Sequence, residues 1–176
     1  KLSYHSLCLI CVTGVDLRFL VQQLHVWMLL VRAKGEGTKG KIFYNQLVQF
    51  FWDDVDHRMQ LMKVDDVTIK SESQRELNDM FYGLLYAYDE GLVKDDTVLA
   101  SAIWRNLFHA SKFTSSAQDL AAMVEYVRRE VRALDDVDPT VLFEKGEIEF
   151  GPPPARAPEM PAQIRPTEAS SDSGQV

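Results

Sequence analysis

Apolar residues recur at steps of three and four along most of the chain, the spacing that places them on one face of an α-helix. The first series falls between residues 17 and 31, and the second between residues 44 and 62. Further series begin near Ser73, near Asp96 and after a capping Ser115 or Ser116. Asp138-Pro139 predicts the start of a short sixth helix. The pattern therefore predicts an all-α fold, an irregular bundle of five or six helices.

Glycine and proline indicate where these helices end. A polar, glycine-rich break at residues 34–40 separates the first two, and Gly91 is predicted to end the third. Residues 147–150 alternate between acidic and apolar side chains, as in a brief strand. Six of the seven prolines lie between residues 152 and 166, so a disordered C-terminal tail is expected. The predicted organisation is a poorly defined segment at 1–15, a helical domain at 16–150 and the tail at 151–176.

Two helices are predicted to be apolar on a second side. Phe19, Val26 and Leu30 lie roughly opposite the main apolar face of the first helix. Trp104 and Phe108 stand off the apolar face of the fourth in the same way. A helix that is apolar on two sides is either central in its bundle or covered by a partner. Both interpretations stay open, and the five residues are the candidate partner-binding set.

Charge is distributed unevenly in this chain, whose net charge is -7. Residues 1–64 carry +3 and residues 65–176 carry -10. Basic side chains surround the glycine-rich break and form the candidate anion- or RNA-binding set: Arg32, Lys34, Lys39 and Lys41. Arg128, Arg129 and Arg132 form a similar group on the fifth helix. For both groups an ordinary solvated surface is the alternative.

Reactive or metal-binding chemistry has little support in the sequence. His5, Cys8 and Cys11 supply only half of a zinc spacing, so no metal site is predicted. The aspartates near residue 54 lack the glycine and glutamate of a calcium loop. His25 and His57 have no evident acid–base partner, and no cofactor motif is present. A small enzyme with an unrecognised site remains the least favoured alternative.

Five sequence blocks resemble one known family in their order and spacing. They are LHVWMLLVR at 24–32, FWDDV at 51–55, YAYDEG at 86–91, AIWRNLF at 102–108 and LAAMVEYVR at 120–128. These blocks, with the glycine-rich break, are similar to the ubiquinol–cytochrome c chaperone family across roughly residues 17–150. Several blocks that match in order are much more specific than any single motif here.

The resemblance implies a non-catalytic assembly chaperone for the mitochondrial cytochrome bc1 complex, on the matrix side of the inner membrane. It implies three partners: a small assembly factor, newly made cytochrome b and the mitochondrial ribosome. No apolar stretch approaches the ~20 residues of a membrane-spanning helix. A generic helical adaptor is the alternative function. The chain begins with Lys1 rather than Met, so a fragment or processed form without its targeting peptide is expected.

Overall fold

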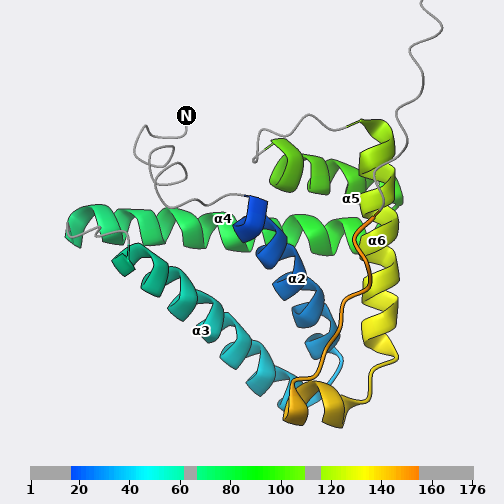
Figure 1. Ribbon diagram of the computed structural model, residues 1–176, viewed down its shortest axis with the longest axis horizontal. Helices are drawn as coiled ribbons and strands as arrows, with labels where there is room; N and C mark the ends of the chain where they lie inside the picture. The colour runs from blue at the N-terminus through cyan, green and yellow to red at the C-terminus, as the bar shows by residue number, and fades with distance from the viewer. Residues whose placement is uncertain (1–16, 62–66, 110–115, 155–176) are drawn as a thin grey trace, which may run out of the picture.

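The computed structural model describes residues 17–61, 67–109 and 116–154 (Figure 1). Within these residues every regular element is helical, which confirms the predicted all-α class. The elements are α2 (Leu17–Lys34), α3 (Gly37–Leu61), α4 (Val67–Val93), α5 (Asp96–Ile103), the π-helical turn η1 (Trp104–His109), α6 (Ala117–Asp135) and the π-helical turn η2 (Val141–Lys145).

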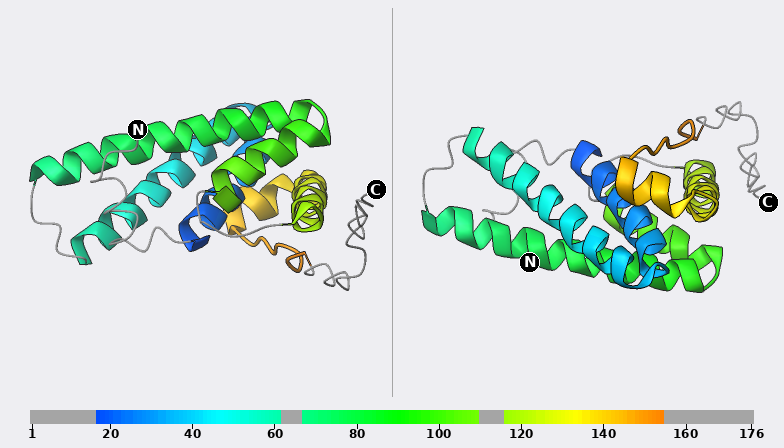
Figure 2. Two further views of the ribbon diagram at one scale, coloured as in Figure 1. Left: turned by 90° about the horizontal axis from the view of Figure 1, so that it is seen from above. Right: turned by 90° about the horizontal axis from the view of Figure 1, so that it is seen from below.

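Helix α2 is the centre of the bundle and contacts α3, α4, α6 and η1. Figures 1 and 2 show α3 running away from the end of α2 and the long α4 returning across it, with α5 folded back against α4. Trp27, Met28 and Leu24 of α2 are at most 1% exposed. Trp27 stacks obliquely on Tyr88 of α4, with ring centroids 5.0 Å apart, so α2 and α4 share one core.

A close approach of backbones shapes the turn between α2 and α3. This turn is shorter than the predicted break, because α3 already begins at Gly37, whose φ of 57° favours glycine. A Cβ atom at Gly40 would lie 1.9 Å from the carbonyl oxygen of Ala33. The glycines of this stretch therefore allow two helices to meet tightly and do not make a long loop.

Helix α4 is longer than predicted at both ends. It begins at Val67, before the expected Ser73, and the predicted stop at Gly91 is wrong because the helix continues to Val93. Gly91 lies where α4 meets α5, and a Cβ atom there would be 2.6 Å from the Cα of Leu99. Glycine at this position therefore allows α4 and α5 to pack closely where they cross. The chain then turns at Asp95, whose carboxylate accepts hydrogen bonds from the N–H groups of Thr97 and Val98.

The C-terminal elements follow the predicted caps more closely. Ser116 caps α6 in a reciprocal pair with Asp119, which confirms the expected start of this helix. Helical structure resumes at Pro139, as predicted, and ends at Gly146 with a φ of 67°. Residues 147–150 form no strand, so that expectation is wrong. Their alternation arises because Ile148 and Phe150 pack against the core while the glutamates face solvent. Met62, the segment at 1–15 and residues 155–176 lie outside the described residues.

Candidate interaction surfaces

The first predicted partner face is occupied by the protein itself. Phe19, Val26 and Leu30 are 3%, 7% and 1% exposed and belong to the single hydrophobic core. Of the two interpretations that the sequence left open for α2, the structure therefore shows the central helix. The accessible surface at these three positions is too small for a docking face.

The second predicted face is accessible at one residue. Trp104 at the start of η1 is 47% exposed, and Phe108 one turn later is half-buried against the core. Turns of π-helix are rare and widen the helix by one residue, which changes the direction of the side chains that follow. Here the change occurs at Trp104, so this large ring stays at the surface while Leu107 enters the core at 1% exposure.

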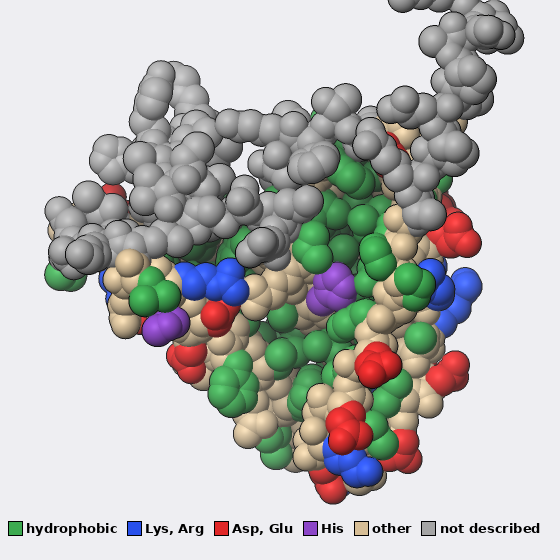
Figure 3. All heavy atoms as spheres, viewed as in Figure 1, with side chains coloured by type: hydrophobic (Ala, Val, Ile, Leu, Met, Phe, Trp, Pro, Cys, Tyr) green, Lys and Arg blue, Asp and Glu red, His purple; other side chains and the backbone are tan. Residues whose placement is uncertain are grey.

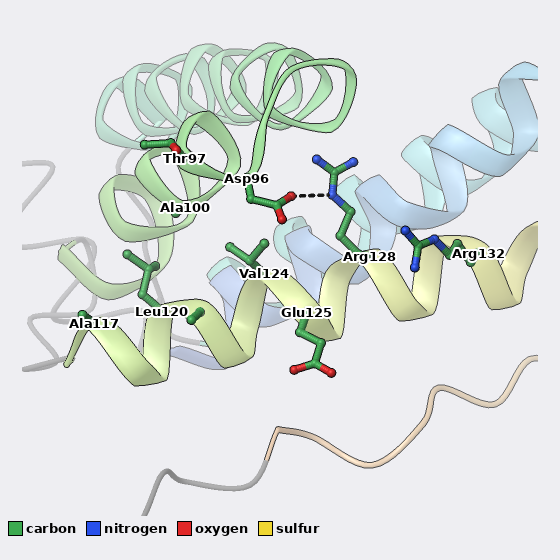
Figure 4. A pocket seen from close by; sticks show the side chains of 10 residues that line it. Asp96, Thr97, Ala100, Ala117, Leu120, Val124, Glu125, Arg128 and Arg132 are labelled. Carbon is green, nitrogen blue, oxygen red and sulfur yellow. Dashed lines mark hydrogen bonds and ion pairs between the residues drawn. The ribbon is translucent and has the colours of Figure 1, made fainter. Parts of the chain in front are cut away.

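An open pocket of about 680 Å³ lies between α5 and α6 (Figure 4). Small and aliphatic side chains line most of it, namely Ala100, Ala117, Leu120, Ala121 and Val124. Its charged end is closed by Arg128, whose Nε donates to Asp96 at 3.0 Å. The Arg128 Nη atoms donate to the carbonyl oxygens of Gly91, Leu92 and Lys94. Arg128 thus caps the end of α4 and is not a surface cation.

The basic group at the α2–α3 turn is also largely engaged in internal contacts. Arg32 is 9% exposed and donates to the carbonyl oxygens of Leu134 and Val137 and to the Glu36 carboxylate. Lys34 pairs with Asp89 of α4, and the Lys39 ammonium lies 3.5 Å from Glu144. The exposed cations are Lys34, Lys39 and Lys41. These three lie at the α2–α3 turn and in the first turns of α3, and Arg32 is buried in the last turn of α2.

His25, Asp54 and Asp56 make contacts within the fold. His25 donates from Nδ1 to the carbonyl oxygen of Val21 at 2.7 Å and accepts at Nε2 from the Tyr126 hydroxyl at 2.8 Å. Asp54 pairs with Arg58, and Asp56 pairs with Lys70 of α4 at 2.8 Å. The described residues contain no group of three or more potential metal ligands. His5, Cys8 and Cys11 are outside the described residues.

The sequence interpretation missed three further exposed aromatic residues. Phe50 is 71% exposed, Tyr86 75% and Tyr82 41%. A signal for two of them was present. Phe50 neighbours the buried Phe51, and Tyr86 is two positions from the buried Tyr88, so each points roughly 100–200° away from a core position. Figure 3 shows apolar side chains gathered between the helices on the face viewed there.

Aromatic residues are enriched at protein–protein interfaces, so the exposed aromatic side chains of this helical fold are its candidate binding positions. The chain belongs to the ubiquinol-cytochrome c chaperone family, whose sequence model matches residues 13–150. Family members are chaperones, a class of binding protein and not of enzymes. Among the described helices, none combines the length and apolar character that a membrane crossing requires.

Curated relatives agree with this assignment. The chain is 44% identical over 134 residues to ubiquinol-cytochrome-c reductase complex assembly factor 1 of Xenopus laevis, which covers 76% of this chain and 66% of that protein. The Homo sapiens protein of the same name is 37% identical over 134 residues, 76% of this chain and 44% of its own length. The mitochondrial protein CBP3 of Saccharomyces cerevisiae is 31% identical over 144 residues, 81% of this chain and 42% of its own length. No solved structure matches this chain.

Proposed function

We propose that the protein is a mitochondrial assembly chaperone for the cytochrome bc1 complex. The observation that carries this proposal is the match between its helical core and relatives named as assembly factors of ubiquinol–cytochrome c reductase. The chain spans less than two thirds of those relatives, so the activity of the whole protein is part of the proposal. A generic helical adaptor remains the alternative.

The finer assignment concerns what the chaperone holds. It works on the matrix side of the inner membrane, where it supports synthesis and early assembly of cytochrome b together with a small partner assembly factor. Trp104 and Phe108 are the residues that we assign to the contact with that partner. Support comes from the 47% exposure of Trp104, because interface hot spots are enriched in tryptophan.

Trp104→Ala tests the partner surface. Truncating a hot-spot tryptophan costs about 2 kcal/mol or more of binding free energy, which is roughly a 30-fold loss of affinity. The matched control is Tyr86→Ala, which removes an exposed aromatic ring from α4. Co-purification of the small partner from mitochondria should fail for the first variant and persist for the second, with helix content retained in both. Equal loss from both variants, or from neither, would place the partner elsewhere.

Contact with the mitochondrial ribosome is assigned to Lys34, Lys39 and Lys41. These ammonium groups are exposed at one end of the bundle, although Lys34 and Lys39 also pair with acidic side chains. Arg32 is engaged in internal contacts, so its contribution is to position this end of the molecule. Phosphate contacts release counterions, so binding through these lysines weakens as the salt concentration rises.

The triple variant Lys34→Gln, Lys39→Gln and Lys41→Gln tests the ribosome contact. Co-sedimentation with mitochondrial ribosomes across a salt series should weaken, and its salt dependence should become shallower. Lys94→Gln is the control, since Lys94 is exposed, pairs with Glu90 and lies outside the α2–α3 turn in the sequence. Unchanged binding with an unchanged salt dependence would show that the three lysines are only solvated side chains of a turn and do not contact the ribosome.

A further inference from the structure

Residues 146–154, here called the strap, cross the seam between α2 and α6. Gly146 leaves η2 in the left-handed conformation, and the residues that follow have no regular structure. Figure 1 shows the strap running beside α6 in the opposite direction, and Figure 2 shows it next to the end-on view of α6. Ile148 and Phe150 pack inward while Glu147 and Glu149 are exposed, so the strap lies in the seam as an extended peptide would.

Two side chains of α6, here called the clamp, hold the strap by its backbone. Glu130 is 3% exposed, and its Oε2 accepts a hydrogen bond from the N–H of Gly151 at 2.9 Å. Arg129 donates from Nη2 to the carbonyl oxygen of Pro152 at 2.7 Å and from Nε to Glu130 at 2.7 Å. Both contacts to the strap are made with main-chain atoms, which any peptide carries.

An aromatic seat lies beside the clamp. The ring of Phe150 meets His25 edge to face, with centroids 4.4 Å apart. His25 is fixed by its hydrogen bonds to Val21 and Tyr126, and Arg129 lies over the Tyr126 ring at 5.1 Å. The clamp and the seat are therefore one connected structure, which recognises an aromatic side chain and the peptide bond after it.

The position after the aromatic residue favours glycine. A Cβ atom on Gly151 would lie 2.8 Å from Oε1 of Glu130 and 3.0 Å from Nη2 of Arg129. Both atoms belong to the clamp contacts, so a side chain at position 151 would displace the ends of Glu130 and Arg129 and weaken these contacts. The groove thus prefers an extended peptide in which an apolar residue, one intervening residue, an aromatic residue and glycine follow one another.

Of the two clamp residues, Glu130 is buried with the strap in place and Arg129 is exposed. A carboxylate removed from water needs hydrogen-bond donors, and without the strap Oε2 of Glu130 would lose the backbone N–H it accepts from. The strap meets this need with few contacts and follows directly on Gly146, a residue able to change its backbone angles. We propose that this groove binds an extended segment of another protein that carries an aromatic residue followed by glycine, and that the strap is its displaceable intramolecular ligand.

This proposal goes beyond the assembly role and holds for any protein that offers such a segment. A fluorescein-labelled peptide with the sequence of residues 145–154 is the probe, and anisotropy measures its binding to the full chain. A tethered ligand acts at an effective concentration of about a millimolar, so the strap should largely exclude the peptide from the unaltered protein. Gly151→Ala releases the strap and should bind the peptide at least ~10-fold more tightly. Glu149→Ala, a change at an exposed strap residue, should behave as the unaltered chain.

Two altered peptides establish the preference of the groove. Replacing the phenylalanine by serine, or the glycine by alanine, should abolish binding to the Gly151→Ala chain. A folded Gly151→Ala chain that binds the peptide no better than the unaltered chain would overturn the proposal. Equal binding of the altered peptides would overturn it as well.

Hydrogen exchange on the unaltered chain covers the case in which Gly151→Ala does not fold. If the strap is displaceable, the Gly151 amide exchanges through an opening that leaves the α2 amides protected. Exchange of Gly151 only together with α2, in global unfolding, would make the strap a permanent part of the core and end the proposal.

Discussion

The Nε atom of Arg32 donates a hydrogen bond to the carbonyl oxygen of Leu134 at 2.9 Å, joining the ends of α2 and α6 across 102 positions of sequence. The last carbonyl groups of a helix have no partner within the helix, so a buried guanidinium there satisfies them. Arg32, which the sequence assigns to a group of surface cations, therefore links two helices.

Arg32→Met should lower the free energy of unfolding by about 2–4 kcal/mol, because hydrogen bonds to charged groups contribute about 1.5–3 kcal/mol each and are not additive. The comparison variant is Lys41→Met, at an exposed position on α3, which should stay within about 0.5 kcal/mol of the unaltered protein. Urea unfolding followed by circular dichroism measures both. Equal stability of the two variants would contradict the role given to Arg32.

Two glycines of α4 should respond in opposite ways to alanine. Gly83 is exposed, and a Cβ atom added there would have no neighbour within 4 Å, so Gly83→Ala should stabilise by about 0.5–1 kcal/mol through helix propensity. Gly91→Ala should destabilise by several times that amount, because its Cβ would meet the backbone of Leu99 at 2.6 Å. Thermal unfolding of both variants distinguishes propensity from packing. A stabilising Gly91→Ala would show that α5 can move away from α4 freely.

Tyr88 should make the protein sensitive to alkali. Its ring is 0% exposed, its hydroxyl has no hydrogen-bond partner among the described residues, and burial raises the pKa of the phenol. Below the ordinary tyrosine pKa of about 10 both folded and unfolded chains keep the proton. Above it the unfolded chain is favoured by ionisation, so stability falls as pH rises through and beyond this value.

Tyr88→Phe should therefore reduce the alkaline loss of stability and leave neutral stability equal or higher by up to about 1 kcal/mol. Tyr126→Phe is the matched control, because that hydroxyl donates to His25 at 2.8 Å and its removal should cost about 1 kcal/mol. Unfolding midpoints in urea, followed from neutral to alkaline pH, test the pair. A Tyr88→Phe chain that is as sensitive to alkali as the unaltered one would assign the effect to other groups.

Low pH should weaken the contact between the C-terminal end of α3 and the N-terminal end of α4 before it affects α2. Hydrogen bonding to Lys70 is the largest of the contacts that hold the pKa of Asp56 below its ordinary value. A carboxylate with a lowered pKa stabilises the fold above its unfolded pKa of about 4, and this contribution is lost as pH falls through the folded value. Amide exchange at low pH should rise around Asp56 earlier than in α2, and Asp56→Asn should remove that difference.

Local sequence signals predicted most of the helices correctly because their causes are local. The cap at Ser116 and the helix start at Asp138-Pro139 depend on residues within one turn, and the apolar spacing of α6 is visible in the sequence. The prediction that α4 ends at Gly91 was wrong because glycine is favoured both where helices cross and where they end. Only the position of Leu99 in space distinguishes them.

The candidate surfaces were harder to predict, because exposure depends on distant packing. Phe19, Val26 and Leu30 carry the same pattern whether a partner or the protein's own helices cover them. Arg32 has its backbone partners more than 100 positions away. The strap contacts depend on Gly151 meeting Glu130, which no periodicity records.

The central position of α2 has a consequence for synthesis on the ribosome. Helix α6 covers part of the apolar surface of α2. Its contact residues come late in the chain: Tyr126 follows its partner His25, and Leu134 follows its partner Arg32, by more than a hundred positions. At about 5–20 residues per second, the nascent α2 waits on the order of 5–20 s before that cover exists. During this interval a helix with two apolar sides is exposed, so we predict that the nascent chain is bound by a general chaperone until α6 has been made.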